Sequence, residues 1–188
     1  MNASRVSEET EIKVPVPDLA PVRARLADNG AARVSEVHDE MNILFDDADG
    51  RLASSNCALR VRHARGRGVV TWKGPASFEG AVKRREEIEL EVPDPAAAER
   101  LLERIGFVPK FRYAKRREEF RCVGCLVALD ETPIGAFVEI EGDPAAIAVA
   151  AAVLGLRHAD AERRSYAGLY RRAREKDPSL PPDMLFRQ

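Results

Sequence analysis

Seven short segments of this 188-residue chain carry charged side chains at alternate positions. Near the N-terminus, "ETEIKV" places Glu9, Glu11 and Lys13 two residues apart. Because successive side chains of a strand point to opposite faces, these three are expected to share one face. Paired carboxylates are ligands for hard divalent cations such as Mg²⁺ or Mn²⁺, and paired Arg and Lys side chains suit phosphate oxygens.

The same alternation recurs along the chain and defines two charged sets. The acids are Glu9, Glu11, Glu87, Glu89, Asp130, Glu139 and Glu141, and the bases are Lys13, Arg60, Arg62, Lys73, Arg85, Lys115 and Arg117. An ordinary amphipathic sheet with its charged face in solvent would also alternate. However, the charged face almost lacks Ser, Thr, Asn and Gln, and like charges two residues apart destabilise a sheet unless an opposite charge lies between them. This composition favours a polar interior.

The balance of charge indicates what such an interior would hold. Two divalent cations would add about four positive charges and a triphosphate about four negative ones, so a loaded site with equal numbers of acids and bases would stay near neutral. The residues therefore indicate a metal site that handles phosphate, and they leave its organic substrate open.

Helices are expected at 18–30, 94–106 and 143–155. In each segment, an Asp that can cap the start of a helix and a Gly that can end it enclose apolar residues. In the last two, Pro follows the Asp and favours the first helical position. Each helix follows a charged alternating segment, so strand and helix recur together.

Two β-hairpins are expected, with turns at 65–67 and 123–124, and a strand is expected at 42–47. A short helix is predicted at 164–172. The remaining residues, 173–188, contain three prolines and are predicted to form a loosely packed C-terminal extension to a single domain of residues 1–172.

The composition is that of a globular protein, with 45% apolar and 32% charged residues and a net charge of −1. We expect no binding of nucleic acid or membrane from this balance, and RNA binding through 60–68 is disfavoured because no aromatic residues are interleaved there. The N-terminus lacks an apolar segment, so we expect a cytoplasmic protein. Cys122 and Cys125 lack a second ligand pair, which favours a hairpin turn over a zinc or redox site.

The ordered set of motifs resembles the CYTH family, also called triphosphate tunnel metalloenzymes. Glu9-x-Glu11-x-Lys13 is similar to the family's ExExK motif, and the resemblance extends over residues 8 to 170. It continues in the family's order through "LRVR", "TWKGP", "RREEIELEV", "YAKRREEF", "LVALDE" and "IGAFVEIEG".

The resemblance implies an α+β fold, in which eight antiparallel strands close into a tunnel with a charged interior and helices packed outside. The implied metal ligands are Glu9, Glu11, Asp130, Glu139 and Glu141, for Mg²⁺ or Mn²⁺. The implied catalytic residues are Glu87, Glu89, Lys13, Arg60 and Lys73. The implied substrate-binding residues are Lys13, Arg60, Arg62, Lys73, Arg85, Lys115 and Arg117.

The resemblance also implies two reactions on a small-molecule triphosphate. One is hydrolysis of inorganic tripolyphosphate, thiamine triphosphate or a nucleoside triphosphate; the other is cyclisation of ATP by a class IV adenylate cyclase. Cyclase members carry a His-Phe pair before ExExK, whereas this chain has Ala3 and Ser4 there, which favours the triphosphatase. A non-catalytic polyphosphate or nucleotide binding module is disfavoured because anion binding gains nothing from seven acids. Monomer and homodimer are both open.

Overall fold

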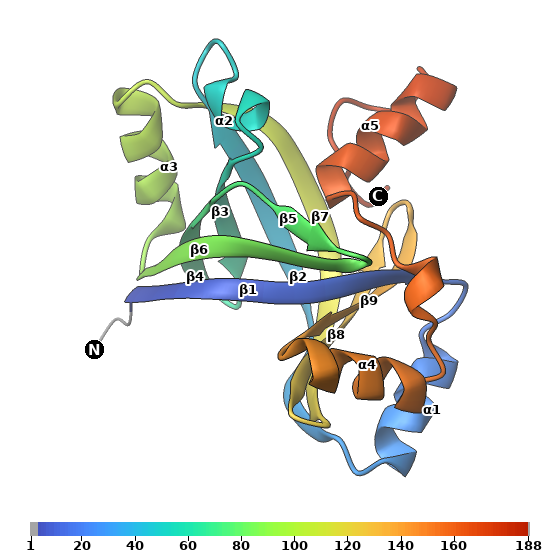
Figure 1. The fold of residues 1–188 in the computed structure, drawn as a ribbon. Helices are drawn as coiled ribbons and strands as arrows, with labels where there is room; N and C mark the ends of the chain where they lie inside the picture. The colour runs from blue at the N-terminus through green and yellow to red at the C-terminus, as the bar shows by residue number, and fades with distance from the viewer. Residues whose placement is uncertain (1–3, 188) are drawn as a thin grey trace.

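Nine strands form one antiparallel sheet in the computed structural model, which describes residues 4–187 (Figure 1). Their order is β1-β9-β8-β7-β2-β3-β4-β6-β5, and β1 also pairs with β6. This last pairing closes eight strands into a barrel and leaves β5 as an extra strand on β6, so the expected fold is confirmed. The strands are β1 (Ser4–Val16), β2 (Ala32–Asp46), β3 (Ala58–Ala64), β4 (Arg67–Lys73), β5 (Ser77–Glu79), β6 (Val82–Val92), β7 (Val108–Cys122), β8 (Cys125–Thr132) and β9 (Gly135–Glu141).

Strand β1 closes the barrel because it pairs with two strands in succession. Its residues from Ser4 to Glu11 lie opposite β6, and those from Glu11 to Val16 lie opposite β9. Glu11 therefore has Lys83 on one side and Glu141 on the other. The register brings charged residues from widely separated segments to one place.

The main apolar core lies outside the barrel, between its outer surface and the helices. Ile12, Val138 and Ile140 project outward and are at most 1% exposed, where they meet Leu26 and Ile147. The last two belong to α1 (Ala20–Asp28) and α4 (Pro144–Val153), which cover the same end of the barrel (Figure 1). Each such buried aliphatic side chain contributes about 1.5–3 kcal/mol. Alternation in the strands thus sends apolar residues outward and charges inward.

Two of the expected helix starts are confirmed. The carboxylates of Asp94 and Asp143 accept hydrogen bonds of 2.9 Å from the N–H groups of Ala97 and Ala145, at the starts of α3 (Pro95–Arg104) and α4. The first helix begins one residue later than expected, since its N-cap is Leu19 rather than Asp18. The remaining helices are α2 (Arg51–Ser54), the 3₁₀ turn η1 (His158–Asp160) and α5 (Tyr166–Lys176).

Both hairpin turns are present as expected. Arg65 and Gly66 join β3 to β4, and Val123 and Gly124 join β7 to β8, all with positive φ between 52° and 74°. Two successive left-handed residues match the twist of the flanking strands in a two-residue hairpin.

Strand β2 differs from the expectation because it begins at Ala32 rather than at Asn42. Register shifts against β7 between Arg33 and His38 break the alternation there, so the pattern is absent from the sequence. The short elements α2 and β5 were not predicted either.

The expectation of a loosely packed tail is wrong. Met184 is fully buried against Tyr113 and Tyr170, and its backbone exchanges hydrogen bonds of 2.9 Å with Arg112 and Ala114 of β7. Helix α5 also runs across residue 172, and the domain boundary placed there stays a prediction.

Ala3 lies outside the described residues, and Ser4 begins β1. No helix of residues 4–187 has the length and apolarity that a membrane crossing needs.

Tail packing is tested by Met184→Ala, which should lower the free energy of unfolding by about 2–5 kcal/mol because it leaves a cavity under β7. Leu185→Ala is the matched control, since that side chain is 39% exposed and should cost less than about 1 kcal/mol. Denaturant unfolding measures both. Equal effects of the two substitutions would contradict docking of the tail.

Candidate active site

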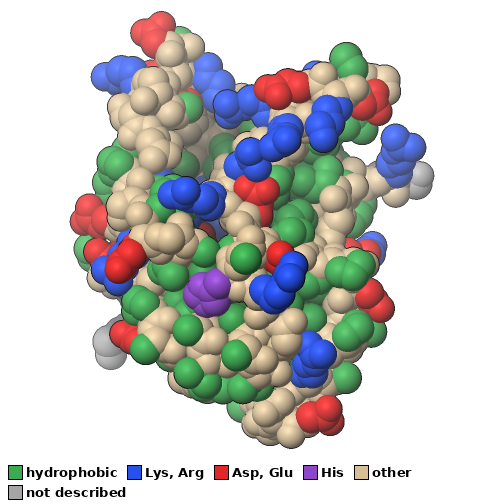
Figure 2. All heavy atoms as spheres, turned by 45° about the vertical axis from the view of Figure 1, so that its right-hand side comes forward, with side chains coloured by type: hydrophobic (Ala, Val, Ile, Leu, Met, Phe, Trp, Pro, Cys, Tyr) green, Lys and Arg blue, Asp and Glu red, His purple; other side chains and the backbone are tan. Residues whose placement is uncertain are grey.

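A cavity of about 550 Å³ runs inside the barrel and reaches the start of α5. Lys and Arg side chains gather around the hollow in Figure 2. Twelve Lys or Arg and seven Glu side chains line the cavity. The bases are Arg5, Lys13, Arg60, Arg62, Lys73, Lys83, Arg85, Lys115, Arg117, Arg163, Arg164 and Arg171, and the acids are Glu9, Glu11, Glu87, Glu89, Glu119, Glu139 and Glu141. The chain as a whole has a net charge of −1, so positive charge is concentrated here.

Every predicted site residue except Asp130 lines this cavity. Residues beyond the predicted sets change the balance of charge, because the bases that line the cavity exceed the acids by five. Lys83 shares the inward face of β6 with Arg85, and the pattern could have revealed it. Arg163, Arg164 and Arg171 come from α5 and the segment before it, which tertiary packing alone brings to the tunnel.

Asp130 lies beneath the cavity and organises the wall formed by β7, β8 and β9. Its buried carboxylate accepts hydrogen bonds from Lys115 at 2.9 Å, from Arg117 at 2.7 and 2.6 Å, and from Tyr166 at 2.7 Å. Burial alone would lower the pKa of Arg117, but Asp130 and Glu139 raise it above its usual value. Asp130 thereby orients the side chains of Lys115 and Arg117, which face the tunnel.

Glu139 lies between cations of the same wall. It contacts Arg117 and lies 3.4 Å from the amine of Lys13. Burial would raise the pKa of Glu139, yet Arg117, Lys115 and Lys13 hold it well below the usual value. The Lys13 amine also lies 4.2 Å from the ring centre of Tyr166 and donates to the carbonyl of Arg164.

A second group of charges lies where β1 meets β4 and β6. The Lys73 amine is 3.2 Å from Glu9 and also contacts Glu87, and Lys83 donates to Glu11 at 2.7 Å. Burial and a hydrogen bond with Glu9 raise the pKa of Glu87 to about 8. Burial opposes ionisation of Glu9 too, but Lys73 and the bond to Glu87 lower its pKa to about 2. Burial and proximity thus favour the proton on Glu87 and the negative charge on Glu9.

Carboxylates lie close together where β1 meets β9. Glu141 lies opposite Glu11, and burial together with Glu9 and Glu11 raises its pKa. Its nearest cation is Arg5, at 3.9 Å. Oxygen ligands that repel one another fit a divalent cation.

The residues of the tunnel match a known family. The CYTH domain family model matches residues 7–166. The chain belongs to the CYTH family. CYTH proteins act as triphosphatases or adenylate cyclases, so the chain is an enzyme of this group.

Individual relatives agree with this assignment. A Methanocaldococcus jannaschii protein named "Putative adenylate cyclase MJ0240" is 32% identical over 136 residues, which cover 71% of this chain and 75% of the relative. The Pyrococcus horikoshii protein PH1819 is 27% identical with a TM-score of 0.70, over 88% of this chain and 99% of that one. The Hippeastrum protein HpAC1, a "putative adenylyl cyclase" described as having a dominant triphosphatase activity, shares the fold at 22% identity, with a TM-score of 0.68 over 94% and 99% of the two chains.

The CYTH tunnel of this chain contains further polar residues that the sequence did not reveal. Glu40 of β2 is 3% exposed and lies 3.5 Å from both Arg62 and Lys115. Next to it, Asn42 is fully buried, and its amide has no hydrogen-bond partner among residues 4–187. Glu40 lies beyond the register shifts, where β2 pairs regularly with β7, and it shares the parity of Asn42 opposite the outward-facing Ile43 and Phe45, a short alternation that could have marked both.

The ionisation of Glu40 should make stability depend on acid pH. Burial would raise its pKa, but Lys115, His38 and further cations lower it well below 4.5. Its contribution is present above the unfolded-state pKa of 4.5 and is lost as pH falls toward the folded-state value. The decline in unfolding free energy between about pH 5 and pH 3 should therefore be shallower in Glu40→Gln than in wild type.

Asp39→Asn supplies the control for this measurement, since the neighbouring Asp39 side chain is 86% exposed. Denaturant unfolding at several pH values compares the three proteins. If the unfolding free energies of Glu40→Gln and wild type fall in parallel as the pH is lowered, the buried ion pairs of Glu40 do not lower its pKa.

Proposed function

We propose that this CYTH protein is a divalent-metal-dependent hydrolase of a triphosphate substrate. The observation that carries the proposal is the excess of twelve Lys or Arg over seven Glu side chains in an enclosed tunnel. A triphosphate carries about four negative charges, which this excess would neutralise. Focused positive charge between low-dielectric walls also attracts such an anion from solution.

The ion pairs of the tunnel suggest how it takes up its substrate. Lys73, Lys83 and Arg117 each contact a carboxylate that also faces the cavity or its wall. If a triphosphate entered together with divalent cations, the bases could exchange carboxylates for phosphate oxygens, and the released carboxylates would then be available to hold the metal. Buried charges thus keep partners before and after binding, which avoids the cost of leaving any of them unpaired.

The donor set fits Mg²⁺ or Mn²⁺, because Glu9, Glu11 and Glu141 supply only carboxylate oxygens and lie close enough for Glu9 and Glu11 to raise the pKa of Glu141. Within residues 4–187, no three Asp, Glu, His or Cys side chains are placed to hold an ion as they stand. Lys73 and Lys83 hold two of these carboxylates instead, so ligation requires the exchange described above. Glu139 completes the proposed ligands. Ligation by Asp130 stays a prediction, and its hydrogen bonds support a positioning role.

The residues of the chain would divide the reaction among them. Lys13, Arg60, Arg62, Lys73, Arg85, Lys115 and Arg117 bind the phosphate oxygens and hold the terminal phosphorus in line for attack by water. Glu87 and Glu89 would orient the attacking water. A divalent metal held by these carboxylates would supply charge stabilisation for the departing diphosphate. Tyr166 and the start of α5 cover one end of the tunnel and limit solvent.

Adenylate cyclase activity is the second candidate, and the name of the M. jannaschii relative favours it. Both reactions use one set of phosphate-binding residues. They differ in the attacking group: water in hydrolysis, and the ribose 3′-hydroxyl of ATP in cyclisation.

A substrate panel separates the two reactions. Tripolyphosphate, thiamine triphosphate, ATP and GTP are each incubated with Mg²⁺ or Mn²⁺, and phosphate, pyrophosphate and cyclic AMP are quantified separately. We expect metal-dependent release of phosphate, abolished by EDTA. Formation of cyclic AMP and pyrophosphate from ATP, with little free phosphate, would contradict the proposed hydrolysis and identify the reaction as cyclisation.

Glu141→Gln tests the metal site with opposite effects on activity and stability. The change removes a proposed ligand, so the metal concentration for half-maximal turnover should rise at least about 10-fold. It also removes repulsion from Glu9 and Glu11, so stability without metal should be equal to or above wild type. Glu131→Gln, at a side chain that is 53% exposed, is the control. An unchanged metal requirement would exclude Glu141 from the ligands.

A further inference from the structure

A second cavity of about 500 Å³ opens beside the charged tunnel, between the segment that holds α2 and helix α5. We call it the mouth pocket; its lining includes residues that the tunnel does not share, among them Ala48, Leu52, Lys110, Phe111, Tyr170 and Arg174. The two cavities adjoin, because Leu44, Ala53, Cys57, Ala58, Ala167 and Arg171 line both. A molecule that extends from the tunnel past these residues would enter the mouth pocket.

The chemistry of the lining changes between the two cavities. Three bases and two acids line the mouth pocket, against twelve and seven in the tunnel. Several of these five side chains make hydrogen bonds within the protein. The Asp46 carboxylate accepts from the N–H groups of Leu52 and Ala53, and Lys110 donates to the carbonyl of Ala48. The mouth pocket has little charge free to hold phosphate.

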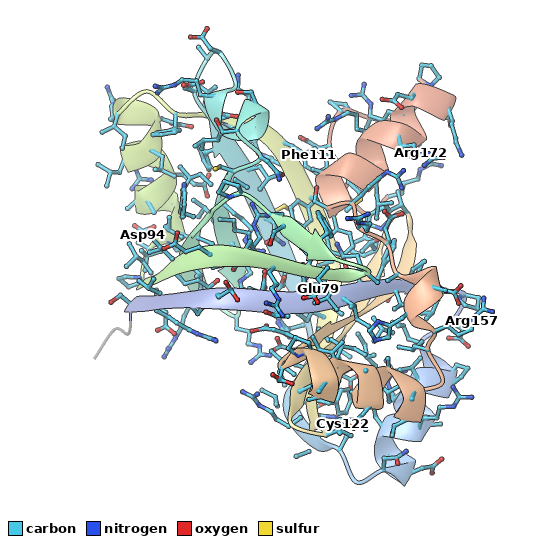
Figure 3. All side chains as sticks on the ribbon, in the orientation of Figure 1. Glu79, Asp94, Phe111, Cys122, Arg157 and Arg172 are labelled. Carbon is cyan, nitrogen blue, oxygen red and sulfur yellow. The ribbon has the colours of Figure 1, made fainter. Side chains whose placement is uncertain are left out.

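Aromatic and aliphatic side chains supply the surface that remains. Phe111 is half-buried near the start of β7 and lies between α2 and α5 (Figure 3). Its ring stacks with Tyr113 at 5.8 Å and 20°, and lies 5.7 Å from Tyr170. Leu44 and Leu52 are likewise half-buried at the wall. Fixed rings beside aliphatic groups suit a flat organic ring.

We propose that the mouth pocket binds the organic part of the substrate, so that the enzyme prefers a triphosphate carrying an aromatic ring system over inorganic tripolyphosphate. This inference rests on the proposed function of the tunnel. The triphosphate lies among the charges, and the organic group lies against Phe111 and the leucines. Inorganic tripolyphosphate fills the tunnel alone and gains nothing from the mouth pocket.

Ala48→Trp tests the proposal by filling the mouth pocket. Ala48 is exposed in the turn after β2 and lines this pocket but not the tunnel. The measured quantity is kcat/KM for ATP, GTP and thiamine triphosphate, each divided by kcat/KM for tripolyphosphate. We expect wild type to favour at least one organic substrate, and Ala48→Trp to lower that ratio about 10-fold or more.

Ser54→Trp is the matched control, because Ser54 is exposed on α2 and lines neither cavity. It should leave the ratio within about 2-fold of wild type. Phe111→Leu is a second variant that keeps apolar volume and removes the ring, and it should lower the same ratio; thermal unfolding confirms that each variant is folded.

The outcomes separate the two proposals. If wild type uses tripolyphosphate at least as well as every organic substrate, or if Ala48→Trp and Phe111→Leu leave the ratio unchanged, the mouth pocket does not bind the substrate while the tunnel's function stands. If the wild-type protein neither binds nor converts any of the four triphosphates, both proposals are overturned.

Discussion

Lys115 and Asp130 keep 3% and 0% of their side-chain surfaces in contact with solvent, 2.9 Å apart inside the barrel. Removing such ions from water costs several kcal/mol each, which their mutual attraction offsets only with good geometry and further hydrogen bonds. Arg117 and Tyr166 supply those bonds. Because the barrel interior is committed to charge, the hydrophobic effect must act on its outer surface, and helices α1, α3 and α4 are needed to cover that surface.

The same constraint shapes the site. Buried bases without substrate still require partners, and the tunnel provides them as carboxylates on facing strands. The arrangement is assembled before binding, so little ordering entropy remains to be lost when a ligand enters. Unequal numbers of bases and acids then leave room for an anion without a separate opening step.

The sequence was informative wherever local rules determine structure. Alternation identified the inward faces of β1, β3, β6 and β9, and Asp followed by Pro located α3 and α4. It was uninformative where distant segments decide the outcome. The register shifts of β2 concealed where this strand begins, so Glu40 was left outside the strand expected at 42–47, and Tyr166 meets Asp130 across 36 residues of chain. Met184 was missed for a similar reason, since prolines around it suggested looseness while its side chain fills a gap under β7.

The double pairing of β1 also bears on how the chain emerges from the ribosome. This strand is synthesised first, but its partner β9 follows only about 120 residues later, on the order of 10 s at ordinary rates of translation. During that interval Ile12 and Val14 belong to an open strand edge, the kind of segment that pairs with other nascent chains. Glu9, Glu11 and Lys13 alternate with these apolar residues along the edge. Charges on an open edge oppose such pairing, so the residues that later line the tunnel are expected to limit aggregation of the unfinished chain before any substrate can reach them.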